Sequence, residues 1–232
     1  MYANVQALRA FAALWVAWYH TMQPVLNGAY GLRVNAGGLP LFHGVGEIGW
    51  MGVDVFFVIS GFIMAYSTKD LDGGTRDAEK FMRKRIRRIV PLYWVLTTLV
   101  VAVAIALPDF FHTYRFDFMH ALKSYFFLPA ERPDGVALPP LVPGWSLNYE
   151  MYFYLVFTVA IWLGVHRRVF VFATLFVLSA VAGQLLQYGN PWSPGTMRFV
   201  ITSPLLLEFL AGVLIAPIAQ RTQARPWICL AL

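Results

Sequence analysis

Long apolar runs, each close to the length that crosses a lipid bilayer, dominate this chain. Hydrophobic residues make up 59% of its 232 residues and charged residues only 13%, which is more apolar surface than a soluble domain can bury. A hydrocarbon core about 30 Å thick requires about 20 mostly apolar residues per helix. Six runs meet this requirement: 5–24, 49–67, 89–108, 144–164, 169–187 and 200–219. The sequence therefore predicts an all-α fold, a polytopic transmembrane helix bundle with six complete spans.

A seventh apolar run begins at Pro226 and is cut off by the end of the chain. We therefore expect residues 1–232 to form a single integral-membrane domain that is incomplete at its C-terminus.

Positively charged residues gather in alternate connections between the runs. Eight Lys and Arg residues lie between positions 68 and 88, and the connections on that side of the membrane carry twelve in total against five on the other side. Because Lys and Arg resist translocation, the N-terminus and segment 68–88 are predicted to be cytoplasmic. The net charge of +6 is then a topology signal, so the expected partner is the lipid bilayer and nucleic acid is not expected.

Two ionisable residues, Arg9 and His20, interrupt the first run. They are eleven positions apart, so a helix with about 100° per residue places them on one face, about 16 Å apart along its axis. Ionisable groups inside a membrane are costly and usually mark a substrate or proton pathway. Taken alone, His20 is equally compatible with a simple hydrogen bond to a neighbouring helix. The aligned pair favours a polar path along the first helix.

Arg85 and Arg88 lie three positions apart where the third run enters the membrane, so on a helix they share a face. A guanidinium group can bind two phosphate oxygens at once, which suits an anionic cofactor approaching from the cytoplasm. Anchoring to the cytoplasmic surface explains the same two residues equally well. The sequence leaves both interpretations open.

Three acidic residues fall within the apolar runs. Glu150 lies in the first two turns of the fourth run, where a buried carboxylate needs a partner, although it could also be an interfacial residue among aromatic side chains. Asp54 is compatible with a solvated acid, and Glu208 with a hydrogen bond between packed helices. Tyr154 is interpreted as a membrane-interface or packing residue rather than as a catalyst. The single Cys and five His residues form no metal-binding motif, so no metal is predicted.

Five segments in order resemble the acyltransferase 3 family of polytopic membrane proteins, which includes O-antigen and exopolysaccharide O-acetylases. The segments are LRAFAALWVAWYH, GVDVFFVISGFIMAY, RKRIRRIVPLYW, WSLNYEMYFYL and LEFLAGVLIA. The most specific features are an Arg and a His separated by ten residues, an Arg-x-x-Arg before Ile-x-Pro, and WSL-x-x-E. Members of that family have about ten spans, so the chain resembles their N-terminal six or seven.

The resemblance implies an enzyme of the bacterial inner (plasma) membrane. Its acyl group, expected to be acetyl, would pass from cytoplasmic acyl-CoA to a hydroxyl of a carbohydrate or glycolipid acceptor in the cell envelope. His20 and Glu150 would be catalytic, and Arg9, Arg85 and Arg88 would bind the acyl-CoA. We expect His20 to act as a general base, a role that typically contributes 10²–10⁴-fold, or else as a transient acyl carrier. Glu150 would orient it.

Two non-enzymatic functions remain open at this point. A transporter or flippase for an acylated sugar or a small anion would use the same polar path, although the internal symmetry of many transporters is not visible in the sequence. A sensor or scaffold would bind acyl-CoA without turning it over. Release of free CoA thiol from acetyl-CoA distinguishes the enzyme from both.

Overall fold

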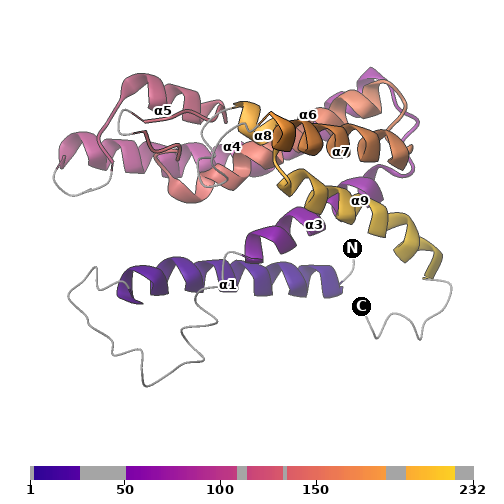
Figure 1. Cartoon of the computed structure of the whole chain (residues 1–232), viewed down its shortest axis with the longest axis horizontal. Helices are drawn as coiled ribbons and strands as arrows, with labels where there is room; N and C mark the ends of the chain where they lie inside the picture. The colour runs from indigo at the N-terminus through magenta and orange to yellow at the C-terminus, as the bar shows by residue number, and fades with distance from the viewer. Residues whose placement is uncertain (1–2, 27–50, 109–113, 133–134, 187–196, 223–232) are drawn as a thin grey trace.

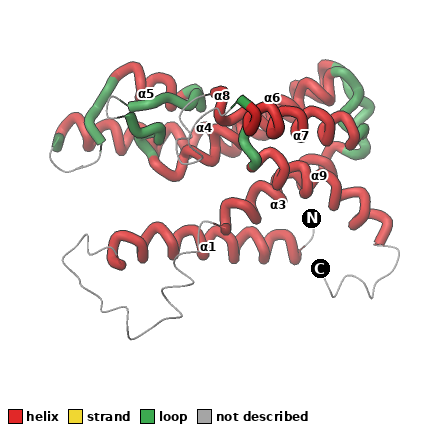
Figure 2. Tube along the Cα trace, viewed as in Figure 1, coloured by secondary structure: helices red, strands yellow, loops and turns green. Residues whose placement is uncertain are grey.

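The computed structural model describes residues 3–26, 51–108, 114–132, 135–186 and 197–222. Within these ranges every regular element is a helix, as the sequence predicts, and Figure 2 shows the described parts as helices and loops. The helices are α1 (Ala3–Leu26), α3 (Met51–Thr68), α4 (Thr75–Ala106), α5 (Phe118–Tyr125), the 3-10 helix η2 (Val142–Gly144), α6 (Trp145–Trp162), α7 (Val169–Leu185), α8 (Met197–Thr202) and α9 (Leu205–Thr222).

The helices are stacked, with the first one on the outside. Figure 1 shows α4, α5, α6, α7 and α8 together at one side of the molecule, the pair α3 and α9 beneath them, and α1 along the far side of α3. The contacts agree with this view: α4 packs on α6, α7 packs on α9 and α8, and α1 packs on α3. Helix α3 therefore lies between α1 and the rest of the fold.

Two helix boundaries differ from the predicted runs. Helix α4 begins at Thr75 rather than at 89, because segment 75–88 contains no glycine or proline and carries Asp77 in its first turn, so the helix extends without interruption into the apolar run. The run 200–219 is split between α8 and α9. Pro204 lacks an N–H and disfavours helical geometry at Ser203, which ends α8.

Only some of these helices have the length and hydropathy of a membrane span. Among the described residues, α3 and α4 are long and apolar enough to cross a bilayer, and Val169–Leu185 and Leu205–Ala219 are apolar but shorter. The helical nature of the predicted runs is thus confirmed, whereas six spans remain a prediction. The start of the seventh run lies outside the described residues.

Aromatic rings from α6, α7 and α9 form the centre of the core. Phe153 stacks on Phe209 with 3.8 Å between ring centroids, and Phe157 stacks on Phe172 at 4.5 Å. All four side chains are buried. Such pairs contribute about 0.5–1.5 kcal/mol each beyond the burial of their area. The core therefore fixes α6, the helix that carries Glu150, against its neighbours.

The backbones of α3 and α9 are in direct contact because each helix places a glycine against the other: Gly61 of α3 faces α9, and Gly212 of α9 faces α3. A Cβ atom on Gly61 would lie 2.0 Å from the carbonyl oxygen of Phe209, and one on Gly212 would lie 1.9 Å from that of Val58. Small residues of this kind allow membrane helices to approach closely. The two helices therefore form one tightly packed unit.

A hydrogen bond from the loop before α4 joins the start of this helix to the end of α6. The N–H of Gly74 donates a hydrogen bond to the carbonyl oxygen of Ile161 at 3.0 Å. Gly73 has a φ of 95°, which favours glycine, and a Cβ there would lie 2.9 Å from the same oxygen. His166 is buried beside this loop, and burial, followed by the charge of Arg167, lowers its pKa. This contact therefore links α4 and α6, the two helices that carry Arg85, Arg88 and Glu150.

Candidate functional site

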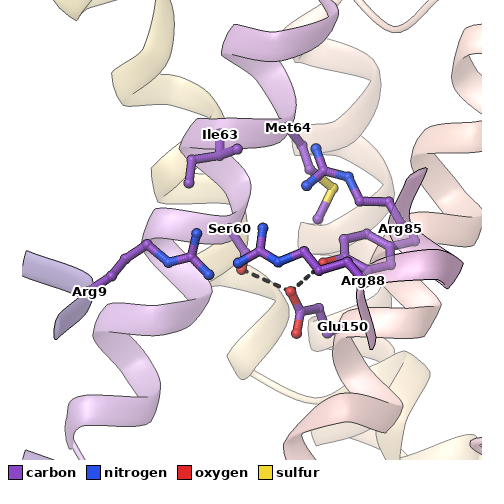
Figure 3. A pocket seen from close by; sticks show the side chains of 8 residues that line it. Arg9, Ser60, Ile63, Met64, Arg85, Arg88 and Glu150 are labelled. Carbon is purple, nitrogen blue, oxygen red and sulfur yellow. Dashed lines mark hydrogen bonds between the residues drawn. The ribbon is translucent and has the colours of Figure 1, made fainter. Parts of the chain in front are cut away.

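Four of the five site residues predicted from the sequence line one pocket. The pocket is formed by side chains from α1, α3, α4 and α6 (Figure 3). Its lining residues are Arg9, Ser60, Ile63, Met64, Arg85, Arg88, Glu150 and Tyr154. Arg9, Arg85, Arg88 and Glu150 thus come together from three helices that are far apart in the sequence.

Two of the arginines face one another. Arg9 enters from α1 and Arg88 from α4, and Figure 3 shows their guanidinium groups directed toward each other near Ser60. Among the described residues, no carboxylate lies within 4 Å of either group, because the ion pairs there are Lys69–Asp70 and Arg83–Glu79. Like charges repel each other, and they do so more strongly near a protein surface than in bulk water. The arrangement is therefore suited to an anion that binds between them.

Arg85 is held by aromatic rings and a hydroxyl. Its guanidinium carbon lies 5.0 Å from the ring centroid of Phe81 and 5.3 Å from that of Tyr154. One guanidinium nitrogen donates a hydrogen bond to the hydroxyl of Ser67 at 3.3 Å. A cation over an aromatic face gains about 0.5–1 kcal/mol when partly exposed. Unlike Arg9 and Arg88, Arg85 is thus fixed by neutral groups.

Glu150 is bound by two hydroxyl groups. Its Oε1 accepts hydrogen bonds from Ser60 of α3, at 3.4 Å, and from Tyr154, one turn further along α6. Three guanidinium groups and a single carboxylate line the pocket, which leaves an excess of two positive charges. A doubly charged anion such as a phosphate would balance that excess.

His20 does not line this pocket. It lies on α1 about 16 Å beyond Arg9, its side chain is exposed, and its ring contacts that of Tyr19 with 5.3 Å between centroids. Glu150 was expected to orient His20, but the structure places Glu150 at the Arg9 end of α1, where Ser60 and Tyr154 bind it. The two residues predicted as a catalytic pair are therefore apart, because Arg9 and not His20 is the residue of α1 that lines the pocket with Glu150.

Sequence reasoning missed the two hydroxyl-bearing residues of the pocket, as well as its two apolar residues Ile63 and Met64. Ser60 was not singled out, and Tyr154 was interpreted as a membrane-interface or packing residue. A signal existed for Tyr154, since it is four residues after Glu150 and such positions adjoin on a helix. Ser60 reaches Glu150 from another helix, and no local pattern indicates that contact.

The free space at the site is unevenly distributed. Between the charged groups there are about 10 Å³, roughly the room for one water molecule. A wider hollow of about 440 Å³ adjoins it. The hollow is lined by Gln6, Arg9, Ala10, Ala13, Phe56 and Arg88. Arg9 and Arg88 line both spaces, so an anion between them has open volume beside it, next to small and apolar residues of α1.

Asp54 of α3 and Glu208 of α9 are neighbouring acids on two helices that pack together. Among the described residues, the Oε2 atom of Glu208 is buried without a hydrogen-bond partner. The interpretation of Glu208 as a hydrogen bonder between packed helices therefore stays a prediction. In the part of the chain that the structure describes, no group of three or more metal-ligating residues occurs.

Comparison with known proteins decides the family. Residues 2–232 match the model of the acyltransferase 3 family, which is described as an acyltransferase domain. The chain belongs to the acyltransferase 3 family. The family match confirms the resemblance noted in the sequence. The chain is thus a member of an acyltransferase family, and the regular elements of its described parts are all helices.

Several curated proteins of the family are similar to this chain. Exopolysaccharide production protein ExoZ of Rhizobium meliloti is 40% identical over 169 residues, which cover 72% of this chain and 50% of ExoZ. The putative peptidoglycan O-acetyltransferase YrhL of Bacillus subtilis is 27% identical over 92% of this chain and 32% of its own length. O-acetyltransferase OatA of Staphylococcus aureus is 26% identical over 77% of this chain and 28% of its own length. The chain therefore spans half or less of the relatives it matches. No solved structure gave a significant match.

Proposed function

We propose that this chain is the membrane part of an O-acyltransferase. It moves an acyl group, expected to be acetyl, from cytoplasmic acyl-CoA to a hydroxyl of a carbohydrate or related acceptor of the cell envelope. The observation that carries the proposal is the facing pair Arg9 and Arg88, beside Arg85, with no carboxylate within 4 Å of the pair in the described ranges. Guanidinium groups arranged in this way suit the phosphates of a CoA donor.

The spacing between Arg9 and His20 supports a phosphopantetheine thioester as the donor. About thirteen covalent bonds separate the phosphorus of this group from its sulfur, and an extended chain advances about 1.2 Å per bond, which gives about 16 Å. The helix rise places His20 about the same distance from Arg9 along α1. A phosphate bound at Arg9 and Arg88 therefore leaves the thioester within reach of His20.

In this proposal His20 is the general base. Its neutral imidazole takes the proton of the acceptor hydroxyl while the hydroxyl oxygen attacks the thioester carbonyl. A carbon–oxygen bond forms, the carbon–sulfur bond breaks, and the proton passes to the departing CoA thiolate. The alternative role for His20 is a transient acyl carrier. Glu150 belongs with the donor-binding residues, since Ser60 and Tyr154 bind it there.

The proposed topology has six spans within a single integral-membrane domain, residues 1–232, in the inner membrane of a bacterium. The N-terminus and segment 68–88 lie in the cytoplasm, where the excess of Lys and Arg supports their placement. This topology brings Arg85 and Arg88 to the cytoplasmic surface, the side from which acyl-CoA arrives. The names of ExoZ and YrhL support a polysaccharide or peptidoglycan acceptor.

The test is release of free CoA thiol from acetyl-CoA by the full-length protein in nanodiscs, with a polysaccharide acceptor. We expect His20→Ala to abolish acyl transfer while CoA binding stays unchanged. Thr21→Val, at the next position of the same helix, serves as the matched control and should remain active. Full activity of His20→Ala would refute the assignment of the base. CoA binding without thiol release by the wild type would instead favour the transporter or sensor.

A further inference from the structure

A series of contacts runs from Ser60 through Glu150 and Tyr154 to Arg85. Ser60 and Tyr154 both donate hydrogen bonds to one oxygen of Glu150. The ring of Tyr154 in turn lies against the guanidinium group of Arg85. Glu150 thus reaches Arg85 through the side chain of Tyr154.

The position of Tyr154 is strongly constrained. Its side chain is only 1% exposed, so its hydroxyl needs a partner inside the protein, and Glu150 supplies it. Phe81 meets the Tyr154 ring edge to face, with 6.3 Å between centroids and 86° between planes. The two rings together form the surface on which Arg85 rests, at 5.0 and 5.3 Å. A change in the tilt of Tyr154 therefore moves Arg85.

The contacts of Glu150 also indicate how it acts. If its negative charge served to pair with an arginine, an ion pair within 4 Å would be expected, and the described residues contain none with Arg9, Arg85 or Arg88. Its contacts are those of a hydrogen-bond acceptor for two hydroxyl groups. The amide oxygen of a glutamine accepts the same two bonds. Charge and hydrogen bonding can therefore be separated at this position.

We propose that Glu150 and Tyr154 are positioning residues that fix Arg85 for the phosphate of the acyl donor, and that Glu150 does not act on the catalytic base. This inference rests on the proposed function, because it concerns the same anion site. It departs from the sequence-based expectation that Glu150 orients His20, and it adds Tyr154 as a determinant of donor affinity.

The test measures CoA affinity, and the KM and kcat for acetyl-CoA, in the full-length protein. Glu150→Gln keeps an acceptor for both hydroxyl groups, so its CoA affinity should fall at least about threefold less than that of Glu150→Ala. Glu150→Ala removes the acceptor of both hydroxyl groups, and its KM should rise about tenfold. Tyr154→Phe keeps the ring but loses the link to Glu150, and its KM should rise about three- to tenfold with kcat unchanged. Tyr152→Phe, two positions along the same helix and outside the pocket, is the matched control and should change neither.

Two results would overturn the inference. If Glu150→Gln loses kcat as fully as Glu150→Ala at unchanged KM, the charge of Glu150 takes part in the chemistry. If Tyr154→Phe binds CoA as the wild type does, the link to Arg85 is without effect. Inorganic pyrophosphate, used as a competing anion, should bind to the wild type and the variants with the same order of affinities as CoA. This measurement does not depend on acyl transfer. Failure of acyl transfer alone therefore refutes the proposed function and leaves the positioning role measurable, whereas a wild type that binds neither probe refutes both.

Discussion

Replacing Gly212 with Ala is expected to push α3 and α9 apart. The added Cβ would lie 1.9 Å from the carbonyl oxygen of Val58 and 2.7 Å from the nitrogen of Phe62, whereas ordinary contact begins at 3.4 Å. Both neighbours are backbone atoms, so no side-chain rotation relieves the clash. The helices must separate by about 1.5 Å at this point. Inserting atoms into a tightly packed interior typically costs about 1–3 kcal/mol.

The same displacement should reach the arginine pocket. Helix α3 carries Ser60 and Met64, which line the pocket, so a shift of α3 moves the hydroxyl that binds Glu150. A misplacement of about 1 Å can cost about 10²-fold in rate. We therefore expect acyl transfer by Gly212→Ala to fall by up to about a hundredfold, together with the loss of stability.

Thermal unfolding in nanodiscs and release of CoA thiol measure the two effects. For a chain of this size, 1 kcal/mol corresponds to about 2–4 °C in Tm, so the expected decrease is about 2–12 °C. Leu214→Ala, at an exposed position of the same helix, is the control and should have little effect. Wild-type Tm and activity in Gly212→Ala would show that the two backbones do not touch, and the reasoning would fail.

Further predictions concern the anion site and the short helix α5. Arg88→Gln should weaken CoA binding by about tenfold or more in a titration, since a hydrogen bond to a charged group contributes about 1.5–3 kcal/mol; unchanged binding would contradict the site. Burial lowers the pKa of His120, so the folded protein resists its protonation and stability should fall as the pH drops below about 6.5. His120→Asn should reduce the change in Tm between pH 7 and pH 5. An unchanged pH dependence of Tm would instead assign it to His166, whose pKa is also lowered. Asp117 caps α5 by accepting a hydrogen bond from the N–H of His120, and Asp117→Ala should cost about 1 kcal/mol, seen as faster amide exchange in α5.

The positions of the helices could be predicted because each apolar run is long enough to indicate a helix without information from the rest of the chain. The start of α4 could not, since segment 75–88 was interpreted from its charge as a loop although it contains no helix breaker. The division of α8 from α9 depends on Pro204, a signal that was present in the sequence but was outweighed by the apolar residues around it. These errors are local, and they leave the order of the helices unchanged.

The charged residues of the site could be found from the sequence, but their partners could not. Arg9 and Glu150 stand out because charge is rare in apolar runs, and Arg85 and Arg88 stand out because they lie three positions apart where the third run begins. Whether two of them meet depends on how the helices pack, and local spacing carries no information about packing. For this reason Glu150 was paired with His20 rather than with Ser60 and Tyr154. The Arg9–His20 spacing, in contrast, lies within one helix and follows from helix geometry alone.

The arginine pocket also bears on how the chain is made. Its residues extend from Arg9 to Tyr154 and are contributed by four helices, so the ribosome has produced two thirds of this sequence before the last of them exists. Arg9 is synthesised first, more than a hundred residues ahead of Glu150. A nascent chain must therefore retain α1, with its charge, until α3, α4 and α6 have been added. Completion of the pocket marks the point at which these four helices have assembled.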